Sequence, residues 1–419
     1  MHGIAGGADD GLIDSRAAWM RLLAAVMLST LGSAPMWSVV VVLPEVQAEF
    51  GTARAGASLP YTMTMVGFVV GGVLMGRLAD RFGVMVPVLI GTASLALGGV
   101  AAAMAPSLIV FGLAYGVLLG CCGAAAVFGP LIADISLWFN RRRGIAVALA
   151  ASGNYLSGTI WPPLLQWGVA SFGWRQAHLA MAAVWIVTML PLAFALRRRA
   201  PMPPPRPVVA GGGTARPLGL SPNVLQTILG LAGVGCCVAM AMPQVHIVAY
   251  CVDLGYGARR GAEMLSVMLA CGIVSRLAFG MIMDRIGGLA TLALGSALQG
   301  IALFLFLPAD GMVALFVVSA VFGLFQGGIV PSYAMIVREH FPPEQAGTRV
   351  GIALSSTLVG MALGGWMAGA IFDATGSYQA AMWNGIGWNL FNLAIALWLL
   401  RRGMRWRGAA GWTAAAART

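Results

Sequence analysis

Long uncharged or nearly uncharged segments, separated by short charged ones, form the main pattern along the chain. A helix crosses the hydrocarbon core of a bilayer with about 20 apolar residues, so each segment is long enough to cross once or twice. Turn-forming residues divide three of the longest segments, at 105–107, 308–311 and 373–377. We therefore predict an all-α membrane protein with twelve spanning helices, formed by the helix around Arg276 and the runs 22–43, 55–76, 82–133, 144–174, 176–196, 217–252, 286–337 and 350–400.

Composition and charge support this interpretation. Of the 419 residues, 59% are hydrophobic and 9% are charged, which is too little charge for the surface of a water-soluble globule. All 25 basic residues are arginine. With the N-terminus in the cytoplasm, 20 of them lie on the cytoplasmic side, and only Arg54, Arg175, Arg259 and Arg260 lie outside. This positive-inside pattern predicts both termini in the cytoplasm, and we expect a bacterial inner (plasma) membrane.

A segment rich in proline, glycine and arginine divides the chain in the middle. It contains Pro203, Pro204 and Pro205 and the glycines 211–213, a composition typical of a linker. We expect a tail over 1–16, a six-helix bundle over 17–196, the cytoplasmic linker over 197–222 and a second six-helix bundle over 223–402. The alanine-rich end from Arg401, with a tail over 403–419, is expected to be unstructured.

The two halves repeat one plan. The turn that begins at Gly76 reads GRLADRFG, and the turn that begins at Gly280 reads GMIMDRIG. At the same offset along the chain, Glu49-Phe50-Gly51 matches Asp253-Leu254-Gly255. Two matches at one offset indicate an internal repeat of six spans.

The paired turns resemble the signature of major facilitator transporters, although Val84 and Met85 stand where that family often has basic residues. The stretch from Trp138 to Ala146, WFNRRRGIA, and the stretch from His246 to Gly255 resemble the monocarboxylate transporter and oxalate/formate exchanger group within that family. The resemblance implies two parallel six-helix bundles that alternate access to a site near the membrane midplane. It implies a transporter rather than an enzyme, without a cofactor.

The signature turns are expected to act as gating elements. Their glycines permit close helix approach and tight turning, and their aspartates lie where a helix N-terminus could attract them. The alternative is an ordinary cytoplasmic loop that follows the positive-inside rule. We also expect Asp134 to join Asp80 and Arg81 in one network. The expected gating residues are Gly76, Asp80, Arg81, Gly83, Asp134, Gly280, Asp284, Arg285 and Gly287.

Arg276 is the one arginine inside a predicted span, and it is the main candidate for substrate binding. A charge at the membrane centre costs at least about 2.5 kcal/mol and normally faces a cavity or a partner. Its planar guanidinium matches a carboxylate with two hydrogen bonds. Alternatively, backbone carbonyls or polar groups such as Gln326 or Asn154 satisfy it.

The charge count refines the expected substrate. The chain contains no lysine, so one fixed positive charge within the spans suits a small organic monoanion. By resemblance, oxalate exchangers add a lysine for a dianion. Mammalian-type monocarboxylate carriers have an aspartate four residues before the arginine and a lysine in the first helix, where this chain has Gly272 and, approximately, Trp37.

Other polar residues within spans are further candidates. His246 could exchange a proton near neutral pH, or it could be a neutral core histidine bonded to a backbone carbonyl or to Gln244. Tyr115 and Asn154 are the polar residues that we expect to line the cavity with Arg276, although helix packing explains them equally well.

The expected partners are a small organic anion, a proton as candidate co-substrate, and the lipid bilayer. The protein is expected to work as a monomer. The arginine triplets abut predicted spans without a basic soluble domain, which argues against nucleic acid binding. The six cysteines lack metal-ligand spacing. An efflux carrier for hydrophobic compounds, and a transporter-like sensor without flux, are the alternative functions.

Overall fold

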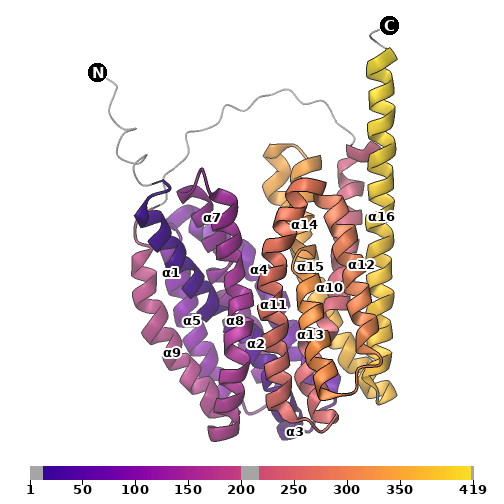
Figure 1. Cartoon of the computed structure of the whole chain (residues 1–419). Helices are drawn as coiled ribbons and strands as arrows, with labels where there is room; N and C mark the ends of the chain where they lie inside the picture. Colours follow the sequence, from indigo (N-terminus) through magenta and orange to yellow (C-terminus); the bar gives the residue numbers. More distant parts are fainter. Residues whose placement is uncertain (1–12, 200–216, 417–419) are drawn as a thin grey trace, which may run out of the picture.

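The computed structural model describes residues 13–199 and 217–416, and the described chain is helical without β-strands. The predicted tail up to residue 12 and linker residues 200–216 lie outside the described residues. Helices before and after the linker form two halves that lie side by side (Figure 1). We call the end of the molecule that holds Ala195 and Pro222, which flank the linker, the linker face, and the opposite end the far face.

Each half is a bundle of long and broken helices. The first half contains α1 (Arg16–Gly32), α2 (Ala34–Val41), α3 (Leu43–Phe50), α4 (Arg54–Phe82), α5 (Met85–Ala103), α6 (Leu108–Leu113), η1 (Ala114–Gly123), η2 (Ala124–Val127), α7 (Gly129–Trp138), α8 (Arg143–Phe172) and α9 (Trp174–Ala195). The second half contains η3 (Pro217–Gly219), α10 (Pro222–Asp253), α11 (Gly257–Ile286), α12 (Gly288–Phe306), α13 (Met312–Gln326), α14 (Ile329–His340), α15 (Pro343–Thr375) and α16 (Tyr378–Ala416).

Ten helical segments of the described chain are long and apolar enough to cross a membrane. Helices α8 and α16 are also long, with 30 and 39 residues, but they are not among the ten. Helix α16 continues to Ala416, so the expectation of an unstructured segment from Arg401 is wrong as far as that residue. The alanines that suggested a disordered tail are also the strongest helix formers, and they extend the helix.

The two signature turns share one backbone conformation. Gly83 ends α4 with φ of +85° and ψ of 163°, and Gly287 ends α11 with φ of +80° and ψ of 169°. Positive φ is readily available only to glycine. The tight turn predicted at both positions is therefore present, and the repeated sequence gives a repeated geometry.

Helix α4 is joined closely to the π-helical segment η1. A Cβ atom added at Gly67 would collide with the carbonyl of Gly116, and one added at Gly71 would collide with the backbone of Cys121. Such contact between backbones is possible only where side chains are missing, as at interfaces of small residues in membrane proteins. Helix α4 and η1 therefore form one rigid seam within the first half.

The two halves meet along two helix pairs, α4 with α15 and α8 with α11. From the far face to the middle of the helices these pairs are in close contact: an added Cβ at Gly369 would lie 3.0 Å from the backbone of Ala55, and one at Gly158, in the middle of α8, would collide with Leu269. Near the linker face, a Cβ at Gly76 or Gly280 would meet no described atom within 4 Å. The close approach expected at Gly76 and Gly280 is therefore not made in this conformation, because the halves touch at the far face instead.

A buried ion pair connects α1 to α7 within the first half. Arg21 Nε donates to Asp134 Oδ2 at 2.7 Å and Arg21 Nη2 donates to Oδ1 at 2.9 Å. The two residues are 5% and 8% exposed, and the guanidinium lies 4.5 Å from the ring centroid of Trp138. The predicted network of Asp134 with Asp80 and Arg81 is not formed among the described residues in this conformation, where Asp134 pairs with Arg21.

Replacing Asp134 with Asn should lower the thermal stability of the detergent-solubilised protein. Removing one partner of a buried pair leaves an uncompensated charge and costs about 3–5 kcal/mol. The exposed Asp80 supplies the matched control, since Asp80→Asn should leave the melting temperature unchanged. Equal melting temperatures for the two variants, measured by tryptophan fluorescence, would contradict a stabilising Arg21–Asp134 pair.

Candidate functional site

Arg276 lies in the middle part of α11 and faces α8 of the other half. Its Nη1 donates to the backbone carbonyl of Ala151 at 3.0 Å. Its guanidinium carbon lies 4.2 Å from the centroid of the Tyr155 ring, at cation–π distance. Both contacts are made to α8, so Arg276 bridges the two halves (Figure 1 shows α8 and α11 side by side).

The hydrogen bonding of Arg276 is incomplete. A guanidinium offers five N–H donors, and among the described residues only Nη1 has an acceptor. Its Nε is buried and has no hydrogen-bond partner there. No described carboxylate forms an ion pair with it, unlike Arg21 with Asp134 and Arg54 with Asp253. Arg276 therefore retains both unused donors and an uncompensated positive charge.

Tyr155 covers Arg276 because Gly272 leaves room for it. An added Cβ at Gly272 would lie 2.5 Å from Cε1 of Tyr155. Gly272 lies four residues before Arg276, one turn away on the same helix face. At this position the resemblance places a carboxylate in mammalian-type carriers, whereas here the aromatic ring of the other half occupies the space.

Asn154 lies beside these contacts on α8, between Ala151 and Tyr155 in sequence. Trp37 Nε1 donates to its backbone carbonyl at 3.3 Å, and its side-chain Oδ1 is buried without a partner in the described chain. Of the other predicted substrate-binding residues, only Asn154 is brought near Arg276.

Two buried glutamines add polar groups on the side of the second half. Gln244 Nε2 donates to Gln326 Oε1 at 2.7 Å, while Gln326 Nε2 has no described partner. The next residue, Gly327, donates its N–H to Ser275 Oγ at 3.1 Å, directly beside Arg276 in sequence. Gln244 thus pairs with Gln326 rather than with His246.

His246 belongs to a different network. It is fully buried in α10, with Nε2 2.8 Å from the carbonyl of Gly365 and Nδ1 3.1 Å from the hydroxyl of Tyr378. Because a carbonyl only accepts, Nε2 carries the proton. The structure therefore places His246 away from Arg276, with both ring nitrogens bonded, as in the alternative of a core histidine that holds a backbone carbonyl.

Tyr115 is likewise part of a buried core, in the first half. Its hydroxyl lies 2.8 Å from Ser38 Oγ and 2.6 Å from His178 Nε2, and the residue is 0% exposed. His178 Nδ1 in turn lies 2.7 Å from the carbonyl of Trp174. These hydrogen bonds connect α2, η1 and α9 within the first half and do not reach Arg276.

The charged residues of the signature turns are exposed in this conformation. Asp80, Arg81, Asp284 and Arg285 have no ion-pair partner among the described residues, and Arg81 lies over the ring of Phe82 at 5.2 Å. On the linker side, Glu339 Oε1 accepts from the N–H of Gly288 at 3.0 Å and so caps α12 after the second turn. Asp284 itself is not engaged there.

Sequence reasoning missed Tyr155 as a partner of Arg276. The signal was present in Gly272, since a glycine one turn before an arginine within a span leaves space for a side chain from another helix. It also missed Glu339, whose position depends on how α14 packs against α12.

Two bundles of long apolar helices that meet at a half-buried arginine are the arrangement expected of a membrane transporter. A family model described as the Major Facilitator Superfamily matches residues 22–312 and 261–411. The chain belongs to the major facilitator superfamily, and it is a transporter rather than an enzyme.

Relatives confirm the predicted resemblance to the monocarboxylate transporter group. The chain is 30% identical over 373 residues to monocarboxylate transporter 13 of Rattus norvegicus, covering 87% of this chain and 84% of the relative. It is also 25% identical over 270 residues to the agnestins efflux protein AgnL12 of Paecilomyces divaricatus, covering 63% and 60%.

Solved structures share the fold. A bacterial homologue of the human lysosomal transporter Spinster, in an inward-facing and occupied conformation, gives a TM-score of 0.73 at 14% identity. The match covers 94% of this chain and 98% of that chain. At this identity, the similarity concerns the fold alone.

Replacing Gly272 with Ala should destabilise the contact between the halves, because the new methyl group displaces the Tyr155 ring from Arg276. Gly280→Ala on the same helix is the matched control. There the methyl group meets no described atom, and Ala is favoured over Gly in a helix by about 0.5–1 kcal/mol. We expect a lower melting temperature for Gly272→Ala and an unchanged or higher one for Gly280→Ala; the reverse order would contradict the packing described.

Proposed function

We propose that the protein is a twelve-helix secondary transporter that moves a small organic anion, a monocarboxylate, across the membrane by alternating access. Arg276 is the proposed binding residue for the carboxylate. The observation that carries the proposal is the state of this side chain: the buried Arg21 and Arg54 have carboxylates, whereas the half-buried Arg276 has a carbonyl and an aromatic ring. A substrate carboxylate would supply the missing charge and accept from the unused donors.

The site suits a single negative charge. Arg276 contributes one positive charge, and the chain contains no lysine that could add a second. Gln326 Nε2 and Asn154 Oδ1 are neutral polar atoms that have no hydrogen-bond partner among the described residues. Both residues belong to the surroundings of Arg276 described above. The name of the rat relative agrees with this substrate class. The expected ligand is therefore a short carboxylate with a neutral polar or apolar remainder.

We further infer the orientation and the state of access. The arginine distribution favours a cytoplasmic linker face in a bacterial inner membrane, with both termini inside. The halves contact each other at the far face and are apart at Gly76 and Gly280, which fits a conformation open towards the cytoplasm. In this interpretation α8 and α16 complete the twelve spans, and the predicted bundles 17–196 and 223–402 are the moving units of a monomer.

An efflux carrier for larger organic compounds is the second candidate. The agnestins efflux relative supports it, and in that case Arg276 serves to hold α11 to α8 through Ala151 and Tyr155. The two functions differ in whether a small carboxylate is moved and whether that movement needs the Arg276 charge. A sensor without flux predicts binding of a carboxylate without its transport.

Arg276→Gln should abolish carboxylate uptake in proteoliposomes while the protein remains folded. Hydrogen bonds to charged groups contribute about 1.5–3 kcal/mol each, so losing two corresponds to a loss of roughly 100-fold or more in affinity. Arg259→Gln, at an exposed position of the same helix, should transport normally. Uptake by Arg276→Gln at the wild-type rate would remove the binding role and favour the efflux carrier.

Proton coupling is tested with a panel of labelled short carboxylates in vesicles that have an imposed pH gradient. Stimulation by the gradient that is lost in His246→Ala would support proton symport through His246. A rate that is indifferent to the gradient would favour anion exchange or facilitated diffusion. Absence of uptake for every carboxylate in the panel would contradict the proposed substrate class.

A further inference from the structure

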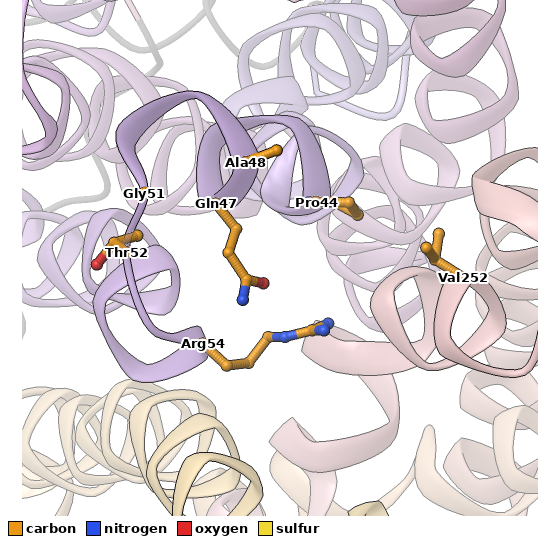
Figure 2. A pocket seen from close by; sticks show the side chains of 7 residues that line it. All are labelled: Pro44, Gln47, Ala48, Gly51, Thr52, Arg54 and Val252. Atoms are coloured by element: carbon orange, nitrogen blue, oxygen red, sulfur yellow. The ribbon is translucent and has the colours of Figure 1, made fainter. Parts of the chain in front are cut away.

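Arg54, the first residue of α4, connects the halves at the far face. Its Nη2 donates to Asp253 Oδ1 at 2.9 Å and Oδ2 at 3.1 Å, and its Nη1 donates to the Tyr378 hydroxyl at 3.2 Å. The guanidinium carbon lies 4.7 Å from the ring centroid of Phe372. All three partners belong to the second half. Figure 2 shows Arg54 extending along a pocket of about 380 Å³, with Gln47 turned towards it.

The second half also caps the backbone of α4. The first N–H groups of a helix need acceptors, but the N-cap residue of α4, Ala53, provides no side-chain acceptor. Instead, Asp373 at the end of α15 accepts from the N–H of Arg54 with Oδ1 and from the N–H of Ala55 with Oδ2, both at 2.8 Å. A carboxylate at a helix N-terminus is also stabilised by the helix dipole.

His246 supports this contact from behind. With its proton on Nε2 and bonded to Gly365, its Nδ1 accepts from the Tyr378 hydroxyl, which in turn accepts from Arg54. An added Cβ at Gly365 would lie 3.0 Å from the Tyr61 ring of the first half. His246 therefore orients both the hydroxyl that receives Arg54 and the backbone against which Tyr61 packs.

A small apolar cluster lies beneath the ion pair. Leu43, Ala57 and Ala249 are buried together, separate from the main core, and come from both halves. Ala57 is three residues after Arg54 and Ala249 is four residues before Asp253, so the cluster lies about one helical turn below the pair. The ion pair and the apolar cluster form a continuous closure at the far face.

The repeat does not contain a second copy of this arrangement. Glu49 is the counterpart of Asp253, but it pairs with Arg175 of its own half at 2.6 Å, and this hydrogen bond lowers the pKa of Glu49. Trp174, the first residue of α9 as Tyr378 is of α16, donates to the same carboxylate at 2.6 Å.

At the offset of the repeat the counterpart of Arg54 is Ala258, and the two arginines that follow it are not free to cross either. In the first turn of α11, Arg259 and Arg260 pair with Glu263 of their own helix at 3.1 and 2.7 Å. The end of α8, residues 168–172, carries no carboxylate that could act as Asp373 does. Position 379 holds Gln where the first half has Arg175, which leaves Asp253 without an arginine in its own half.

We propose that Arg54, Asp253 and Asp373 form the latch that holds the far-face gate closed, and that Tyr378 and His246 are its positioning residues. The corresponding ion pair of the first half, Glu49 with Arg175, joins two helices of one bundle. The latch joins the two bundles and must open when the halves separate at the far face. Both the side chain and the backbone terminus of α4 are released in the same step. The latch rests on the alternating access of the proposed function, but not on the identity of the substrate.

The latch is tested by the accessibility of a reporter cysteine at position 57, which is 1% exposed in the closed state. Ala57→Cys is labelled with a membrane-impermeant maleimide from the far face, with the protein lacking this substitution as background. Adding Arg54→Gln or Asp253→Asn should raise the labelling rate roughly tenfold or more, because charge-assisted hydrogen bonds across the gate are lost. Arg175→Gln and Glu49→Gln, the matched pair within one half, should leave the rate unchanged.

A second set of variants separates the latch from a general loss of folding. The exchange Arg54→Asp with Asp253→Arg restores opposite charges and should return the labelling rate towards that of Ala57→Cys alone. Tyr378→Phe should give an intermediate rate. The comparison uses variants that stay monodisperse in size-exclusion chromatography. The proposal would be overturned if Arg54→Gln and Asp253→Asn left the labelling rate of Ala57→Cys unchanged. It would also be overturned if Arg175→Gln and Glu49→Gln raised the rate as much, because the effect would then not depend on contacts between the halves.

Discussion

A guanidinium that is buried or half-buried among apolar helices has to find acceptors and a counter-charge, and this requirement organises the protein. Arg21 receives a bidentate carboxylate and ties α1 to α7. Arg54 receives Asp253 across the gap between the halves. Arg276 receives a carbonyl and an aromatic face, which satisfy it only in part. Arginine thus has three roles here: Arg21 joins two helices of one half, Arg54 joins the halves in the proposed latch, and Arg276 is the proposed binding group. The role depends on how many acceptors and counter-charges the protein itself supplies.

The incomplete satisfaction of Arg276 has a mechanical side. Its contacts come from α8, so the arginine already joins the halves when no ligand is present. A carboxylate that bound there would compete with Ala151 for the guanidinium or use its remaining edge, and either event changes how α11 is held to α8. In an alternating-access carrier, this is the direct physical connection between occupancy and movement of the bundles.

Much of the architecture could be predicted from the sequence, because a bilayer constrains it strongly. The duplicated turns at Gly76 and Gly280 predicted two similar halves, and Gly83 and Gly287 share their backbone conformation. One charge in an apolar helix also singled out Arg276, which the structure places in contact with the other half. For His246 and Tyr115, the sequence showed a polar side chain within a span but not which neighbouring helix that side chain faces. A histidine that faces Gly365 and one that faces a cavity have the same local sequence.

Contacts between segments far apart in the sequence could not be predicted, because they depend on how the helices pack and, between the halves, also on the conformation. Asp134 was matched with the nearest charged turn, whereas it pairs with Arg21 from the start of the chain. Arg54 was counted only among the arginines on the outer side and Asp253 only as part of the repeat, and the packing of α4 against α10, α15 and α16 makes them partners. The continuation of α16 to Ala416 shows a different limit, since an alanine-rich composition is compatible with both a helix and a disordered tail.

The seam between α4 and η1 has a consequence for how the two ends of the molecule communicate. Gly67 and Gly71 allow the middle of α4 to pack against the backbone of η1, so α4 cannot slide or bend there without disturbing the whole first half. Arg54 and Gly76 lie at opposite ends of this helix, roughly 33 Å apart at the usual helical rise. Because the seam fixes α4 to η1, Arg54 and Gly76 move as parts of one body. In the proposed alternating-access cycle, a rotation of the first half that parts Arg54 from Asp253 would bring Gly76 towards the second half, so the two ends would not be open together.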